Sequence, residues 1–114
     1  MRVLNQTRGA PLITRGRVAD SFWLRLKGLL GADPLQSQEG LVLVGDKSIH
    51  TFFMGFPIDV VYVDKEHRVI RTDINMVPYR VGPFVSRSAY VLEMPAGTIA
   101  DTATQVGDQL QFDL

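Results

Sequence analysis

The 114-residue sequence predicts a mainly β fold, as a single-domain antiparallel β-sandwich or partly closed barrel with two short helices. Three observations lead to this class. Short segments rich in β-branched and aromatic residues recur along the chain, Gly and Pro separate them at short intervals, and several alternate apolar with polar residues. At this length we expect one domain, residues 1–114, with one sizeable core.

The strands follow from these apolar segments, taken in chain order. The expected strands are residues 2–5, 12–18, 40–45, 48–54, 58–63, 68–76, 90–94 and 109–114. The last of them alternates clearly, with Leu110, Phe112 and Leu114 on its inner face.

Two short helices interrupt the strands. Asp20 or Ser21 can cap a helix near residues 21–27 that ends at Gly28. Thr98 can cap a second one near residues 99–105, with Asp101 three residues on and Gly107 closing it.

The stretch from Ser48 to Asp64 holds the residues of greatest chemical interest. In the strand 58–63 both faces are apolar, which is typical of a central, buried strand, so Asp59 at its head should be buried. A buried carboxylate must be hydrogen-bonded, paired with a cation or protonated, because a lone charge costs several kcal/mol. One strand earlier, His50 stands among apolar neighbours.

Two loops differ in what they indicate. Residues 64–67 connect two strands of a hairpin, and His67 fits a turn position because histidine tolerates a positive φ. Residues 77–88 show no clear period and contain two prolines and two arginines. Loops of this length are uncommon in small domains unless they cover or form a site, so this one is a functional hint.

Composition excludes several classes of function. Lys plus Arg and Asp plus Glu are 12 each, so no basic footprint for nucleic acid or an anionic membrane surface is present. The absence of cysteine excludes disulfides and thiol catalysis. No run of about 18 apolar residues and no signal-peptide core occurs, so we expect no membrane segment and a cytoplasmic protein.

Several ordered motifs resemble the bacterial and archaeal family known as domain of unknown function 192, over about residues 18–110. The matching blocks are Ala19-Asp20-Ser21, Arg25, Lys27-Gly28-Leu29-Leu30, Glu39-Gly40-Leu41, Ile49 to Met54, Pro57 to Asp64, Val91 to Gly97 and Gly107-Asp108. The resemblance implies a small, mainly β, sandwich-like domain and no established activity. The chain departs from the family where many members have Trp-Met-Lys-Asn-Thr and this one has residues 53–57, Phe-Met-Gly-Phe-Pro, and at His67, where many have Gly.

Four ionisable residues lie within these motifs: Arg25, His50, Asp59 and Glu93. One interpretation is structural, with Arg25 bridging one or both buried carboxylates as an internal ion pair. The other is functional, with His50, Asp59 and Glu93 converging on a pocket for a polar ligand or for acid and base catalysis.

The favoured function is therefore a non-enzymatic binding or structural domain for an unknown small ligand, with a polar site around His50. Its ligand would lie between the His50 strand and the 77–88 loop. The alternative is a small metal-assisted or acid/base hydrolase that uses His50, Asp59 and Glu93. No metal-ligand spacing or phosphate loop is complete, so no metal site is predicted, and the sequence leaves the cofactor and the oligomeric state unknown.

Overall fold

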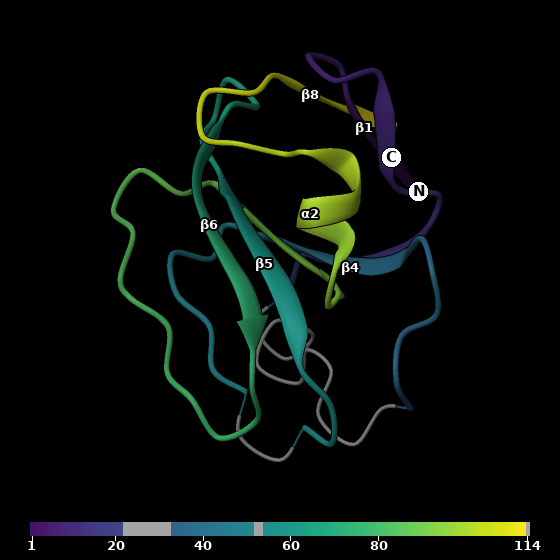
Figure 1. Cartoon of the computed structure of the whole chain (residues 1–114). Coiled ribbons are helices and arrows are strands. Elements are labelled where there is room, and N and C mark those ends of the chain that lie inside the picture. The colour runs from purple at the N-terminus through teal and green to yellow at the C-terminus, as the bar shows by residue number, and fades with distance from the viewer. Residues whose placement is uncertain (22–32, 52–53, 114) are drawn as a thin grey trace.

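A computed structural model describes residues 1–21, 33–51 and 54–113, which form two β-sheets and a short helix (Figure 1). The elements are β1 (Arg2–Asn5), β2 (Ala10–Ile13), β3 (Arg15–Ala19), β4 (Glu39–Val44), β5 (Ile58–Val63), β6 (Val69–Met76), β7 (Tyr90–Pro95), α2 (Thr98–Thr102) and β8 (Leu110–Asp113). The predicted mainly β class is confirmed. Within these ranges, no helix is long and apolar enough to cross a membrane.

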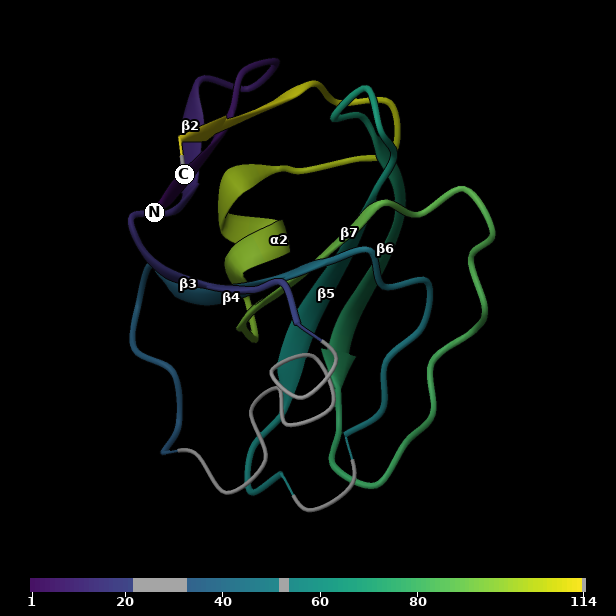
Figure 2. The same ribbon diagram turned by 180° about the vertical axis from the view of Figure 1, so that it is seen from behind.

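The two sheets remain separate, so the sandwich is the correct alternative and no barrel closes. The smaller sheet has the order β2-β1-β8, and the larger has the order β3-β4-β7-β5-β6. All the described strand pairs are antiparallel, as predicted, except β3 and β4, which run parallel. Figures 1 and 2 show the small sheet at one end of the molecule, with α2 between it and the larger sheet.

The larger sheet is covered on both faces, and β5 contributes to both cores. Every residue of β5 is buried, which confirms the central strand predicted for residues 58–63. The inner core lies between the sheets and contains Val3, Leu12, Ile13, Val42, Val61, Val63, Val69, Leu92, Met94, Ile99 and Leu110. The outer core covers the opposite face and contains Ala19, Leu41, Leu43, Ile49, Met54, Phe56, Ile58, Val60, Tyr62 and Val91.

The strand expected over residues 12–18 is in fact two strands, which belong to different sheets. The break is at Thr14, where the backbone N–H groups of Thr14 and Arg15 both donate to the carbonyl of Gln38. Pro11 lies in β2, an edge strand, where a missing N–H donor is tolerated. The chain thus leaves one sheet and enters the other within a single residue.

The strand expected over residues 48–54 does not form as a regular element. Only His50 makes a β-bridge, with Val81 in the following loop, and residues 52–53 lie outside the described ranges. The backbone of this segment bonds instead to the 77–88 loop: Thr51 N–H donates to Arg80 O at 2.8 Å, and Gly82 N–H donates to Ile49 O at 2.8 Å.

The second expected helix is α2, but its ends differ from the prediction. Gly97 is the N-cap residue, and the Thr98 hydroxyl donates to the carbonyl of Pro95 instead of capping the helix. The helix ends at Ala103, which has a φ of 56°, whereas Gly107 lies in the later turn before β8. The helix expected near residues 21–27 lies almost entirely outside the described part of the chain.

The hairpin position of His67 is confirmed by its φ of 66°. Its ring stacks on Phe112 with the centroids 4.6 Å apart and meets Tyr90 edge-on at 5.3 Å. A histidine at this turn therefore supplies an aromatic contact, which a glycine could not.

Candidate functional site

Asp59 is a buried structural anchor. Its side chain is on the inner face of β5, and only 1% of the residue is exposed. Oδ1 accepts a hydrogen bond from Asn75 N–H at 2.9 Å, and Oδ2 accepts from Gly97 N–H at 3.1 Å and Ile99 N–H at 2.8 Å. The carboxylate thus caps α2 and fixes Asn75, whose φ is 49°.

Glu93 lies on the opposite face of the same sheet. The pairing of β5 with β7 sets Asp59 opposite Met94 and Val60 opposite Glu93. Because residues that pair across two strands share a face, the Glu93 side chain points into the outer core with Val60. The single pocket expected for His50, Asp59 and Glu93 is therefore not formed, because the sheet separates the two carboxylates.

The Glu93 carboxyl is buried without a full set of hydrogen bonds. The residue is 3% exposed, and among the described residues its Oε1 has no hydrogen-bond partner. Burial, helped by the negative charge of Asp46, raises the pKa of Glu93 to about 8. The carboxyl group is therefore mostly neutral at pH 7.

Tyr62 places a second unpartnered oxygen on this face. It belongs to the outer core with no exposed surface, and its hydroxyl has no hydrogen-bond partner within the described ranges. Burial and the charge of Asp73 raise the pKa of Tyr62 to about 12. The hydroxyl lies directly under Gly82, where an added Cβ would come within 2.8 Å of it.

The segment around His50 and the 77–88 loop are bonded to each other. Besides the backbone bonds already given, the Thr51 hydroxyl donates to Val77 O at 2.7 Å and accepts from Arg80 N–H at 2.9 Å. Ser48 Oγ donates to Gly82 O at 3.1 Å. These bonds join the two segments directly where the ligand was expected, and the other side of the loop lines a groove.

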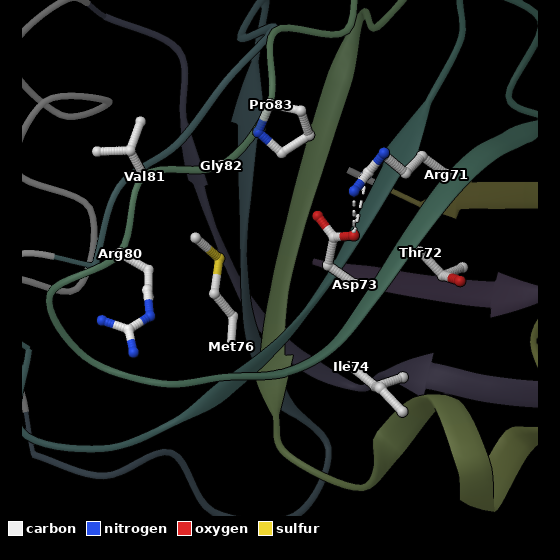
Figure 3. Close-up of a pocket in the computed structure, with 9 residues that line it drawn as sticks. All are labelled: Arg71, Thr72, Asp73, Ile74, Met76, Arg80, Val81, Gly82 and Pro83. Atoms are coloured by element: carbon white, nitrogen blue, oxygen red, sulfur yellow. Dashed lines mark hydrogen bonds and ion pairs between the residues drawn. The ribbon is translucent and has the colours of Figure 1, made fainter.

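On that other side, a groove of about 460 Å³ separates the loop from β6 (Figure 3). We call it the β6 groove. The residues that line it are Arg71, Thr72, Asp73, Ile74, Met76, Arg80, Val81, Gly82 and Pro83.

The charged groups of the β6 groove are two arginines and one aspartate. Arg71 binds Asp73 through Nε at 3.0 Å and through a terminal nitrogen at 2.9 Å. Both side chains point toward Pro83, while Arg80 extends from the loop beyond Met76 (Figure 3). No described residue forms an ion pair or hydrogen bond with the Arg80 guanidinium, so the groove carries one uncompensated positive charge.

The remaining predicted site residues are Arg25 and His50. Arg25 lies outside the described residues, so its ion pair with Asp59 or Glu93 stays a prediction. His50 is half-buried and bridges to Val81, next to the loop wall of the groove. In the part of the chain that the structure describes, no three His, Asp or Glu side chains gather as metal ligands. The sequence did not single out Arg71, Asp73 or Arg80, although Arg80 is one of the two arginines of the loop whose length was a functional hint.

Comparison with known proteins defines the family. The family model DUF192, described as an uncharacterized ACR, matches residues 3–112, so the chain belongs to this family. A UPF0127 protein of Thermococcus sibiricus is 27% identical over 98% of this chain and 75% of its own length. Another, from Pyrococcus horikoshii, is 27% identical over 96% of this chain and 97% of its own length.

Solved structures show the same fold. A crystal structure of a protein of unknown function from Novosphingobium aromaticivorans superposes with a TM-score of 0.84, at 23% identity, over 97% of this chain and 82% of that one. A crystal structure described as that of a putative transcription regulator from Sinorhizobium meliloti has a TM-score of 0.80 at 22% identity, over 96% of this chain and 89% of that one. The family and the fold resemblance inferred from the motifs are confirmed, and the family is one of unknown function.

Proposed function

We propose that the protein is a non-enzymatic binding domain whose ligand is a small molecule with an anionic group, held in the β6 groove. The observation that carries this proposal is the Arg80 guanidinium, which stands at the groove without an acidic partner among the described residues. A guanidinium offers a planar set of donors that matches a carboxylate or a phosphate.

Two hydrogen bonds with Thr51 hold the backbone of Arg80 in place. Its N–H donates to the hydroxyl of Thr51, a fully buried residue, and its carbonyl accepts from Thr51 N–H. Arg71 is oriented by Asp73 on the opposite wall, and Met76, Val81 and Pro83 supply apolar surface between the charges. A fixed polar group beside apolar walls is the usual composition of a small-molecule site.

The hydrolase alternative gains no support from this geometry. It requires His50, Asp59 and Glu93 to act on one substrate, but Asp59 and Glu93 lie on opposite faces of the sheet. Both oxygens of Asp59 are occupied by backbone N–H groups, so this carboxylate is poorly placed to accept a proton from a substrate.

A thermal-shift screen of small carboxylates and phosphate esters tests the proposal. We expect at least one compound to stabilise the parent protein, because a ligand that binds only the folded state raises its stability. The same compound should bind Arg80→Gln at least about tenfold more weakly, since a hydrogen bond to a charged group contributes about 1.5–3 kcal/mol.

The matched control is Lys65→Gln, which removes one positive charge from the exposed hairpin loop at the other end of β6. It should retain the full stabilisation. Equal binding by the parent and Arg80→Gln would contradict the proposal, as would a screen in which no anionic compound stabilises the parent.

A further inference from the structure

The outer edge of β6 is open for pairing along part of its length. β6 is the last strand of the five-stranded sheet and has eight residues. At its beginning, Val69 N–H donates to Asp108 O, and Val69 O accepts from Gly107 N–H. Near its end, Asn75 N–H donates to the carboxylate of Asp59. Between them, residues 70–74 make no backbone hydrogen bond beyond those to β5 within the described chain.

We infer that two copies of this chain pair through residues 70–74, antiparallel and with Thr72 opposite Thr72. This inference does not depend on the proposed ligand, although Arg71 and Asp73 also line the β6 groove. Arg71 and Asp73 already pair with each other within one chain, and in this register Arg71 of each copy also stands opposite Asp73 of the other. Opposite charges that face each other across two strands stabilise an antiparallel pairing. The edge is therefore complementary to itself.

The same charges disfavour the neighbouring registers. Centring the pairing on residue 71 would set Arg71 against Arg71, and centring it on residue 73 would set Asp73 against Asp73. A parallel pairing in register would oppose like charges at both positions. Because like charges directly opposite are destabilising, the sequence specifies one register among these.

The 77–88 loop leaves this edge accessible. Gly82 packs over the Tyr62 hydroxyl, so this part of the loop lies above the outer face of the sheet. Figure 3 shows Arg71 and Asp73 on the side of β6 that faces Pro83, with Thr72 and Ile74 on the other side. Ile74 is 68% exposed and would be covered by the second copy.

The proposed pairing involves two copies only. A two-fold contact uses the same surface on both copies and therefore gives a dimer, not a fibre. The register between β5 and β6 is irregular between Val69 and Arg71 and between Asp73 and Met76, so the regular part of the open edge is limited to residues 71–73. Since so few residues take part, the buried area is small, and we expect a weak dimer that depends on protein concentration.

Charge reversal tests the pairing by sedimentation equilibrium. Arg71→Asp makes the edge acidic at both positions, and Asp73→Arg makes it basic at both. Each variant alone should dimerise at least about tenfold more weakly than the parent, because two attractive pairs become repulsive. An equimolar mixture of the two should recover association, since every pair across the edge is then of opposite charge.

Two controls accompany the mixture. Both variants should keep the parent circular dichroism spectrum, because Arg71 is exposed and Asp73 half-exposed, and Lys65→Asp, which changes a charge away from the edge, should dimerise like the parent. A parent that stays monomeric at millimolar concentration would overturn the inference. A mixture that associates no better than its separate components would overturn it as well.

Discussion

Asp59 and Glu93 are both buried in adjacent strands, but their carboxyl groups differ in their hydrogen bonds. Asp59 accepts three backbone N–H bonds and has no cationic side-chain partner among the described residues. Glu93 has an unpartnered oxygen in an apolar cluster, and its pKa of about 8 keeps it neutral at pH 7. The difference arises because backbone N–H donors reach Asp59 on the inner face of the sheet, whereas Glu93 lies among the apolar side chains of the outer core.

Replacing Asp59 by alanine should destabilise the fold strongly. The change leaves three N–H donors without their acceptor, and we expect a loss of about 3 kcal/mol or more in the free energy of unfolding. Chemical denaturation measures this loss. Asp101→Asn, which alters an exposed carboxylate in the same helix, should change stability by less than about 0.5 kcal/mol. If Asp59→Ala unfolded at the parent's denaturant concentration, its anchoring role would be refuted.

The pKa of Glu93 predicts how stability depends on pH. In the unfolded chain this carboxyl ionises near its ordinary value of 4.5, and in the folded protein only near 8. The folded state thus binds more protons between these values, so this group contributes stability that is fully present below pH 4.5 and is lost as the pH rises to 8. The slope is at most about 1.4 kcal/mol per pH unit.

The variant Glu93→Gln keeps the shape of the side chain and removes the titration. Urea unfolding of the parent and the variant at a series of pH values should show a flatter profile for the variant and a gain in its relative stability toward pH 8. Parallel profiles over this range would mean that Glu93 does not titrate as described.

At the scale of single residues, the sequence predicted that Asp59 and Glu93 are buried, but not which face of the sheet each side chain occupies. Alternation along each strand indicates which neighbours share a face with Asp59 or with Glu93. Whether those faces coincide depends on the register of β5 against β7, which is set by contacts between residues far apart in the chain. The capping of α2 by Asp59 joins residues 40 positions apart, and no local signal could have revealed it.

Among the elements, the 77–88 loop differs most from its surroundings. Its length predicted a functional role, and the structure shows it bonded along one side to residues 47–51 and open to the β6 groove on the other. Residues 48–54 had the composition of a strand, but in the described part of this segment the backbone groups of Ile49 and Thr51 bond to this loop. Composition predicts an extended segment and cannot predict its partner.

The position of the loop over Tyr62 depends on the absence of a side chain at Gly82. An added Cβ would lie 2.8 Å from the Tyr62 hydroxyl and 3.3 Å from the carbonyl of Ile49, so the loop would have to move. We expect Gly82→Ala to cost about 1–3 kcal/mol, as overpacking typically does. Differential scanning calorimetry measures the change.

Gly55→Ala is the comparison for this variant, because a Cβ there meets no atom within 4 Å. It should leave the melting temperature nearly unchanged or slightly raised. Equal melting temperatures for Gly82→Ala and the parent would show that the loop is not packed against Tyr62.

At the scale of the whole molecule, a polar cluster connects residues near the N-terminus with residues near the C-terminus. The Asn5 amide donates to Thr104 and to Asp108, each at 3.0 Å, and Arg8 pairs with the same Asp108 oxygen at 3.0 Å. Burial alone would raise the pKa of Asp108, but these bonds and one from Gln105 N–H lower it. The cluster therefore stabilises the fold above pH 3.8 and weakens as the pH falls further.

The class of fold was the most predictable property at this scale, since strand composition and turn residues repeat along the chain. The assignment of strands to the two sheets was not predicted, because the break at Thr14 that splits residues 12–18 between them depends on a bond to Gln38. The β6 groove could not be predicted from the sequence either, because residues 71–74 and 80–83 come together only when the loop folds back over the sheet.

An amide NMR titration of the parent protein, with the strongest binder from the screen of carboxylates and phosphate esters, tests the central claim most directly. If the ligand lies in the β6 groove, the largest shift changes should fall on the amides of residues 71–74 and on those of 80–82, beside Pro83. Changes centred instead on Asn75, Gly97 and Ile99 around Asp59, or spread evenly over the sheet, would contradict it.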